Sequence, residues 1–178
     1  FNNEIVLGLA TTGLFYYDIL RKSWVQIQNP EYHGGVLSSF FDKKQQILWV
    51  GTNNNGVISS YREQLNFKCI ANKDLSNRHA SAVRAINEDG QGRIWVGSRG
   101  NGVSIITNPL MANSKVINIP EFINKSILSI CKGPDNLMFI GSESEGLFAV
   151  DYKTLNVKRV DLSKSRKFSY TSNPPVYG

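Results

Sequence analysis

The sequence predicts an all-β protein built from a repeated unit of four short strands. A motif with two glycines five positions apart occurs four times, short apolar runs alternate with polar turns around it, and no segment keeps a helical period. The copies read IVLGLATTGLF from Ile5, LWVGTNNNGVI from Leu48, IWVGSRGNGVS from Ile94 and MFIGSESEGLF from Met138. Their first glycines are 43, 46 and 44 residues apart, which is the length of one β-propeller blade.

The glycine motif could instead be a phosphate-binding loop, because the third copy reads GSRGNG. A phosphate loop is needed once and at the start of a helix, whereas this motif recurs with changing residues between its glycines. The fourth copy places two carboxylates there, Glu143 and Glu145, which would repel a phosphate. We therefore expect each pair to end one strand and open the next, where glycine tolerates positive φ angles. The pairs are Gly8 and Gly13, Gly51 and Gly56, Gly97 and Gly102, and Gly141 and Gly146.

The four strands of each unit follow in order around the glycine pair. A first strand is expected 14 residues before the first glycine, in LSSFF from Leu37, VRAI from Val83 and ILSIC from Ile127. The polar segments DKKQQ, EDGQG and KGPDN lead from there into the second strand, as hairpin turns do. A third strand follows the second glycine, and after another polar turn come WVQI, FKCI, VINI and VKRV as fourth strands. The aromatic residues Trp49, Trp95 and Phe139 share one position in the second strand and are expected to pack between blades.

These units predict one incomplete β-propeller of about four blades over residues 1–178. The expected divisions are a partial blade at 1–32, blades at 33–74, 75–121 and 122–160, and a tail at 161–178 in which FSYT (168–171) could begin a further strand. The first copy lacks its leading strand. Because open sheet edges invite pairing, we expect the chain to pack against remaining propeller blades or a second copy of itself.

Charge and composition narrow the classes of partner. Of the net charge of +6, the segment 158–167 carries +4, with five basic residues and one acid. A basic run of this kind is most often solvated, so we expect no nucleic acid to bind this chain, although a polyanion is the alternative. No stretch approaches the roughly 18 apolar residues of a membrane span, so any membrane attachment would come from segments outside this chain.

Cysteines and histidines give no sign of a metal site. Cys69 and Cys131 lie 62 positions apart in alternating apolar runs, so both are expected to be buried thiols. His33 and His79 have no cysteine or carboxylate at ligand spacing. We expect neither a metal nor another cofactor.

The segment 75–106, LSNRHASAVRAINEDGQGRIWVGSRGNGVSII, resembles the two-component regulator propeller repeat. The match runs through Asn87, Glu88, Asp89, Gly92, Ile94, Trp95, Val96, Gly97, Ser98 and Gly102. The copy at 48–57 lacks the acidic turn, and the copy at 138–147 has Phe139 in place of tryptophan. The resemblance implies an extracytoplasmic, periplasmic sensor region of a Bacteroides-type hybrid two-component system, which detects an oligosaccharide and signals to a histidine kinase.

Internal comparison indicates where a ligand would bind. Both the residues within the glycine pairs and the lengths of the connections from a fourth strand to the next first strand vary, and propeller geometry places them on one rim. Amides, arginine and histidine there suit sugar hydroxyls and acidic groups, and Tyr32 or Phe122 could stack on a sugar ring. The ligand-binding candidates are Asn53, Asn54, Asn55, Arg99, Asn101, Glu143, Glu145, His33, Arg78 and His79, with Asn77 and Asn124 on the same connections.

Two other classes of function stay open. An enzyme would need paired carboxylates, a histidine base or a metal near the central channel, yet the first strands offer there only Ser38, Ser39, Arg84, Asn87 and Ser129, with Asp42 and Glu88 at their ends. We therefore expect no catalytic residues. A scaffold that binds proteins should carry a broad apolar patch, whereas these loops are polar, which favours a sensor.

Overall fold

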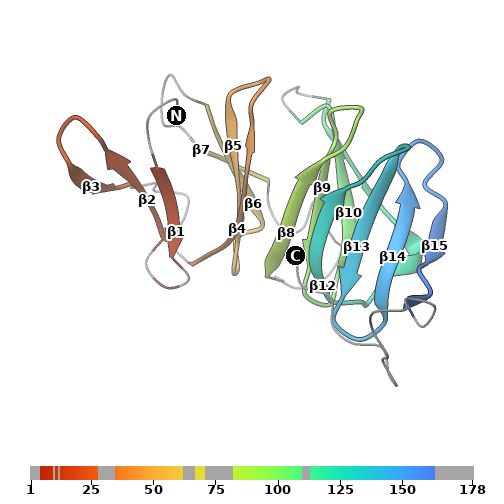
Figure 1. Cartoon of the computed structure of the whole chain (residues 1–178). Helices are drawn as coiled ribbons and strands as arrows, with labels where there is room; N and C mark the ends of the chain where they lie inside the picture. Colours follow the sequence, from red (N-terminus) through yellow and green to blue (C-terminus); the bar gives the residue numbers. More distant parts are fainter. Residues whose placement is uncertain are drawn as a thin grey trace. The chain divides into compact units, whose positions relative to one another are not determined.

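The computed structural model describes residues 5–9, 11, 13–27, 35–61, 67–70, 82–109 and 113–162 (Figure 1). Within these ranges the chain forms β-strands and a turn of 3-10 helix at Pro120–Phe122, with no α-helix. No helix in this part of the chain is long and apolar enough to span a membrane. The all-β prediction is therefore confirmed.

The described strands form four antiparallel sheets, which follow the sequence copies in order. The first has three strands, β1 (Ile5–Leu9), β2 (Gly13–Asp18) and β3 (Ser23–Gln26). The second has β4 (Val36–Asp42), β5 (Ile47–Thr52), β6 (Val57–Tyr61) and β7 (Phe67–Ile70). The third has β8 (Val83–Glu88), β9 (Ile94–Ser98), β10 (Gly102–Thr107) and β11 (Lys115–Asn118). The fourth has β12 (Ile127–Lys132), β13 (Leu137–Ser142), β14 (Gly146–Asp151) and β15 (Val157–Arg159).

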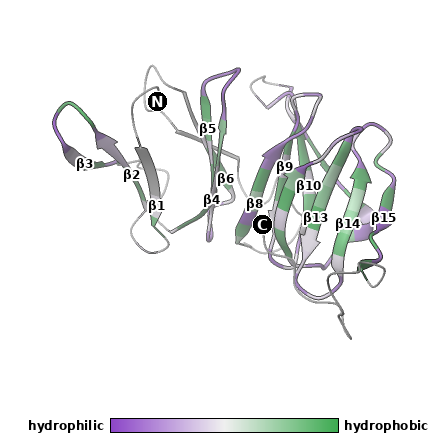
Figure 2. Ribbon diagram, viewed as in Figure 1, coloured by the Kyte–Doolittle hydropathy of each residue, from purple (hydrophilic) through white to green (hydrophobic). Residues whose placement is uncertain are grey.

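The chain divides into two compact units, 1–83 and 84–178, which are described separately. Each unit has its own hydrophobic cluster. Leu14, Val36, Leu48, Val50 and Ile58 form the first, and the second joins β8–β11 to β12–β15 around Trp95, Phe122, Ile127 and Ile140. Figure 2 shows hydrophobic residues along β10 and β14 and hydrophilic residues in the turns.

The two glycines of each motif have different structural roles. The second glycine of every pair has a positive φ, from 73° at Gly56 to 99° at Gly13, as expected for residues that open a strand. The first glycine lies inside its strand and is required for close packing instead. A Cβ on Gly97 would lie 2.6 Å from the Ile127 side chain of the next sheet, and one on Gly51 would lie 2.6 Å from Val83.

The first strand of the second sheet begins one residue earlier than predicted. Val36 pairs with Thr52, and Leu37, the expected start, sits at a register shift and is exposed. The turn between β4 and β5 consists of residues 43–46, and the pair Asp42 and Ile47 closes it. The spacing from Val36 to Gly51 is therefore 15 residues, against 14 from Ile127 to Gly141, and the extra residue is absorbed in this turn.

Two of the three aromatic residues at the shared position are fully buried. Trp95 is fully buried in the cluster between β8–β11 and β12–β15, as predicted. Its indole nitrogen donates a 2.8 Å hydrogen bond to the buried carboxylate of Asp89. Trp49 is also fully buried in its sheet. Phe139 lies on the outward face of the fourth sheet and is only half-buried.

The prediction that Cys131 is a buried thiol is wrong. Cys131 pairs with Phe139 in register and is an exposed free thiol on the outward face of the fourth sheet. Ile130 and Ile140, on the opposite face, are buried in the cluster. The alternating pattern gave the strand correctly, but it does not distinguish a covered face from an uncovered one. The side chain of Cys69 lies outside the described residues.

Candidate functional site

In three of the four copies a hydroxyl residue comes directly after the first glycine: Thr52, Ser98 and Ser142. The Thr52 hydroxyl accepts a hydrogen bond from the Asn55 amide at 2.9 Å and donates to the Gly56 carbonyl at 2.8 Å. Ser142 accepts from the Glu145 amide at 2.7 Å in the same way. These side chains hold the ends of the loops by local hydrogen bonds, so the residues between the ends are presented outward.

In the second unit, Ser126 brings two of the variable loops together. Its hydroxyl accepts a 3.1 Å hydrogen bond from the Gly100 amide, and its carbonyl accepts a 2.9 Å bond from the Glu143 amide. The Lys125 carbonyl also accepts from the Gly102 amide at 2.9 Å. The two glycine loops and the connection after the 3-10 turn therefore form one continuous surface, which we call the unit 2 rim. It consists of residues 99–101, 123–126 and 143–145 together with Arg84.

Two ion pairs fix the carboxylates of the unit 2 rim. Glu145 accepts a 2.5 Å bond from the Lys125 ammonium group, which also lies 5.4 Å from the centre of the Phe148 ring. Glu143 lies 3.6 Å from the Arg84 guanidinium group. Each of the two predicted acidic residues is thus paired with a cation on a neighbouring segment.

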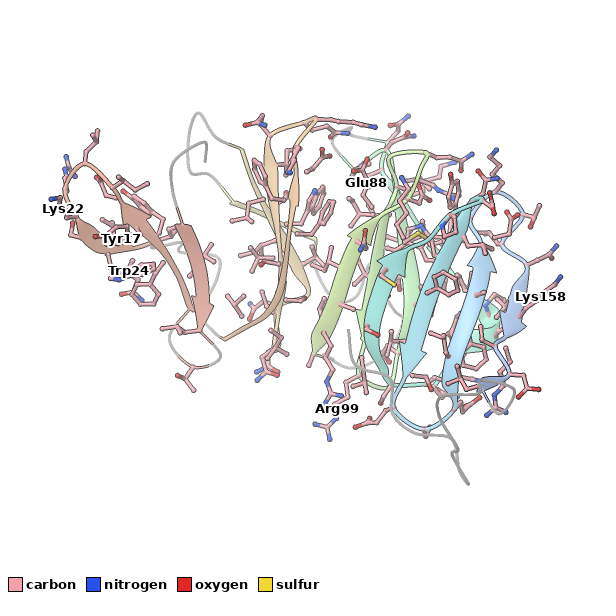
Figure 3. All side chains as sticks on the ribbon, in the orientation of Figure 1. Tyr17, Lys22, Trp24, Glu88, Arg99 and Lys158 are labelled. Carbon is pink, nitrogen blue, oxygen red and sulfur yellow. The ribbon has the colours of Figure 1, made fainter. Side chains whose placement is uncertain are left out.

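Arg99 is the cation that the unit 2 rim presents to solvent. Its side chain is exposed, and Figure 3 shows it projecting away from the strands. Among the described residues it forms no ion pair. Asn101, two positions further on, is half-buried, and Asn124 is exposed with a φ of 65°. A guanidinium group and two amides are therefore presented by adjacent loops of one surface.

The predicted asparagine loop lies in the first unit. Asn53 and Asn54 are exposed, Asn55 is half-buried, and the Asn53 amide donates a 3.0 Å hydrogen bond to the Gly35 carbonyl. This loop is built like the loop at 143–145, but it belongs to a different unit. His33, Asn77, Arg78, His79 and Tyr32, which were predicted for the same surface, lie outside the described residues.

The suggestion that Phe122 stacks on a sugar ring is wrong. Phe122 is fully buried, and its ring meets Phe148 edge-on with the centroids 5.2 Å apart. The segment Pro120–Phe122 forms a turn of 3-10 helix that directs this ring into the core. A sequence with a single aromatic residue on a connection does not show which way that residue points.

The structure adds three contributors that sequence reasoning did not place on the rim. Arg84 was assigned to the first strands lining a channel, but it is the second residue of β8 and its guanidinium group lies beside Glu143 in the glycine loop of the next copy. Lys125 and Ser126 were not singled out. One weak clue to Arg84 was available in the sequence. Arg84 directly follows the predicted strand start at Val83, and the start of a first strand lies at the glycine-loop end of its sheet.

Other polar residues of the first strands connect neighbouring sheets. The Asn87 amide group donates a 3.1 Å hydrogen bond to the Ile130 carbonyl, so it links β8 to β12. The Ser38 hydroxyl donates to the Val83 carbonyl at 3.4 Å, within the first unit. Two of the residues weighed for catalysis thus have structural partners.

The repeated sheets, the glycine loops and the acidic turn at Asp89 together characterise the fold. Residues 78–100 match the family model of the two-component regulator propeller. This match includes the Trp95–Asp89 pair and the first loop residues of the unit 2 rim. No curated protein matches the sequence.

The solved structures that superimpose on this chain include extracellular domains of bacterial hybrid two-component systems. The extracellular domain of the hybrid two-component system BT4673 from B. thetaiotaomicron superimposes with a TM-score of 0.74 and 19% identity, over 97% of this chain and 23% of that one. The corresponding domain of BT3049 from the same organism gives 0.70 and 17%, over 96% and 22%. PorZ, a surface component of the type-IX secretion system of Porphyromonas gingivalis, gives 0.70 and 14%, over 97% and 27%. The chain spans about a quarter of the length of these proteins, and the likeness establishes the propeller fold.

Proposed function

We propose that this chain is the ligand-binding part of a sensor propeller, which detects an oligosaccharide outside the inner membrane and signals through a hybrid two-component system to a histidine kinase. The match to the regulator propeller family supports a sensor role. Similarity to extracellular domains of two hybrid two-component systems supports a periplasmic location. In this proposal the chain binds its ligand and does not transform it.

The observation that carries the proposal is the composition of the unit 2 rim. An exposed guanidinium group at Arg99 lies on the same surface as the amides of Asn101 and Asn124, and Ser126 connects the segments that bear them. Planar donors and amides match sugar hydroxyls, carboxylates and sulfates, because they provide several directed hydrogen bonds at once. The backbone of both loops is fixed by hydrogen bonds, so binding would require little ordering of the protein.

The charge on this rim favours an acidic oligosaccharide over a neutral one. Lys125 and Arg84 are paired with glutamates, and these pairs leave Arg99 as the cation exposed to solvent among the described rim residues. An exposed arginine next to hydrogen-bond donors is suited to a carboxylate or sulfate group. A neutral oligosaccharide would use the amides alone.

The proposal is tested by a thermal-shift screen of the chain against neutral and acidic oligosaccharides. Ligand that binds the folded state raises the unfolding free energy by mass action, by about 2.7 kcal/mol when its concentration is 100 times Kd. We expect an acidic oligosaccharide to raise the melting temperature, and Arg99→Ala to abolish the shift. Asn54→Ala tests in the same screen whether the asparagine loop of the first unit contributes.

Lys115→Ala is the matched control. Lys115 is an exposed cation of the same unit, and its register with Thr107 places it at the opposite end of β10 from Gly102. It should leave the ligand-induced shift unchanged. A panel without any shift would contradict oligosaccharide sensing and favour a protein-binding scaffold, and release of shorter sugars during incubation would contradict a non-enzymatic role.

A further inference from the structure

We propose that Glu143 is an internal substitute for an acidic group of the ligand. It masks Arg84, and a ligand with two acidic groups displaces it and binds Arg84 and Arg99 together. The inference rests on the proposed function of the unit 2 rim, and it narrows the ligand to oligosaccharides that carry carboxylates or sulfates on neighbouring sugars. The two ion pairs of this rim carry the inference, because they are built differently.

The pair between Lys125 and Glu145 is a fixed part of the rim. Its two atoms are 2.5 Å apart, within hydrogen-bond distance, and the Lys125 ammonium group also lies 5.4 Å from the centre of the Phe148 ring. The Glu145 amide donates a 2.7 Å hydrogen bond to the Ser142 hydroxyl. A ligand that displaced Glu145 would have to break a hydrogen bond between two charged groups, which is among the stronger polar contacts in proteins.

The pair between Arg84 and Glu143 is looser. The guanidinium nitrogen and the carboxylate oxygen are 3.6 Å apart, beyond hydrogen-bond distance, and the Glu143 side chain is 47% exposed. The Glu143 backbone is fixed separately, because its amide donates a 2.9 Å hydrogen bond to the Ser126 carbonyl. The carboxylate can therefore turn into solvent while the loop keeps its conformation.

Arg84 and Arg99 lie at the same end of two neighbouring strands. Arg84 is the second residue of β8, Arg99 directly follows β9, and the two strands are adjacent in their sheet. Strands joined by a hairpin turn run in opposite directions, so the start of β8 lies at the same end as the end of β9. This stretch of the rim therefore carries two guanidinium groups, each able to hold a carboxylate or sulfate by paired hydrogen bonds.

This arrangement makes the rim selective for the number of acidic groups on a ligand. A ligand with one acidic group binds Arg99, which is already exposed. A second acidic group gains Arg84 only by replacing Glu143. Because ion pairs between exposed side chains are weak, this replacement costs the ligand little. An internal competitor of this kind gives specificity by disfavouring ligands that cannot replace it.

The test is a double-mutant cycle on Arg84 and Glu143, with binding of a chondroitin sulfate tetrasaccharide measured by titration calorimetry. Glu143→Gln should raise the affinity by about two- to fivefold, the strength of an exposed ion pair, and Arg84→Gln should lower it. In the Arg84→Gln background, Glu143→Gln should lose most of its effect, because its benefit comes through Arg84.

Asp135→Asn is the matched control for charge. Asp135 is an exposed acid of the same unit in the turn between β12 and β13, at the opposite end of its sheet from the glycine loop. The substitution removes one negative charge, as Glu143→Gln does, and should leave the affinity for the tetrasaccharide unchanged.

Masking of Arg84 can also be measured without a ligand. Phenylglyoxal modifies accessible guanidinium groups, and mass spectrometry of the digested protein gives the rate at each arginine. Glu143→Gln should speed the modification of Arg84 and leave that of Arg99 unchanged. An unchanged rate at Arg84 would overturn the masking.

The outcomes separate this inference from the proposed function. An equal gain from Glu143→Gln in both backgrounds would overturn the inference, since the effect would then be one of general charge. Binding of the tetrasaccharide by Glu143→Gln alone would overturn the displacement, because the unsubstituted rim would then not release Arg84. Binding of neutral oligosaccharides alone would overturn the inference and leave oligosaccharide sensing intact.

Discussion

At the scale of single residues, the three complete copies satisfy the shared aromatic position differently. Asp89 lies six residues before Trp95. Its carboxylate accepts hydrogen bonds from the indole nitrogen of Trp95 at 2.8 Å and from the guanidinium group of Arg93 at 2.7 Å. Six residues before Phe139 stands Gly133, where a Cβ would overlap the phenyl ring. Six residues before Trp49 stands Lys43, and the buried indole nitrogen of Trp49 has no hydrogen-bond partner among the residues that the structure describes. The aromatic ring at this shared position therefore has different surroundings in each of the three copies.

The two tryptophans predict a measurable contrast. Trp95→Phe and Trp49→Phe lose the same volume, but the first also removes a buried hydrogen bond and the second removes an unsatisfied donor. Because a hydrogen bond to a charged group contributes about 1.5–3 kcal/mol, we expect Trp95→Phe to lower the unfolding free energy by at least about 1 kcal/mol more than Trp49→Phe, even though Arg93 still donates to Asp89. Denaturant unfolding of both variants measures the difference. Equal losses would show that the Asp89 bond contributes nothing to stability.

Gly97 predicts an effect of steric overlap. A Cβ there would lie 2.6 Å from Ile127 Cγ2, so Gly97→Ala should destabilise the second unit by about 1–3 kcal/mol. Ile127→Ala removes the overlapping atoms at the cost of a cavity. The double variant should lose less unfolding free energy than the two single variants lose together. A double-mutant cycle measures this coupling. Simple additivity would mean that the overlap is relieved elsewhere.

At the scale of elements, the strands were predictable because alternating apolar residues and recurring glycines mark both their period and their ends. All fifteen strands expected in the four copies appear, with limits that differ by one or a few residues, as in β11 and β15. The further strand considered at 168–171 lies outside the described residues. The register of β4 was not predictable, since the extra residue in the turn at 43–46 has no signature in the hydrophobic pattern. The 3-10 turn before Phe122 was missed because three residues are too few to show a period.

The turn between β14 and β15 predicts a pH dependence. Backbone amides of Thr154 and Lys153 donate to the Asp151 carboxylate and lower the pKa of that group below 3.8. A lowered pKa means that the stabilisation is present above the ordinary value and is lost as pH falls through the pKa of the folded state. An NMR titration should place Asp151 below an unpaired aspartate, and Asp151→Asn should reduce the acid sensitivity of this turn. A midpoint at or above 3.8 would contradict the assignment.

At the scale of the whole molecule, stability is divided between two clusters. Among the described residues, the cluster around Leu48 and the cluster around Trp95 share no member. Met138 is fully buried in the second cluster, so Met138→Ala should cost about 2–5 kcal/mol there. Hydrogen exchange should then show faster exchange in β8–β14 and unchanged protection in β4–β6. Equal loss of protection in both units would show that they unfold as one body.

The candidate site was predictable only in part, because it depends on contacts between segments that lie far apart in the sequence. The glycine loops were found because they recur, and their variable residues are indeed presented outward at Arg99 and Asn54. The contacts of Glu143 with Arg84 and of Glu145 with Lys125 join segments 59 and 20 residues apart. Such contacts depend on how one sheet is set against the next, which a periodic pattern leaves undetermined.

The way the glycine loops are anchored has a consequence for how this protein could acquire a new specificity. Thr52 and Ser142 close their loops through hydroxyl groups and backbone atoms, and the second glycine supplies the turn. The three residues between these anchors contribute almost nothing to the hydrophobic clusters. They can be exchanged in each copy without refolding the strands beneath them. Changing a few residues per repeat is therefore enough to change the recognition surface. A library randomised at 53–55, 99, 101 and 143–145 should yield mostly folded proteins, with Gly100 kept because its φ is 78°.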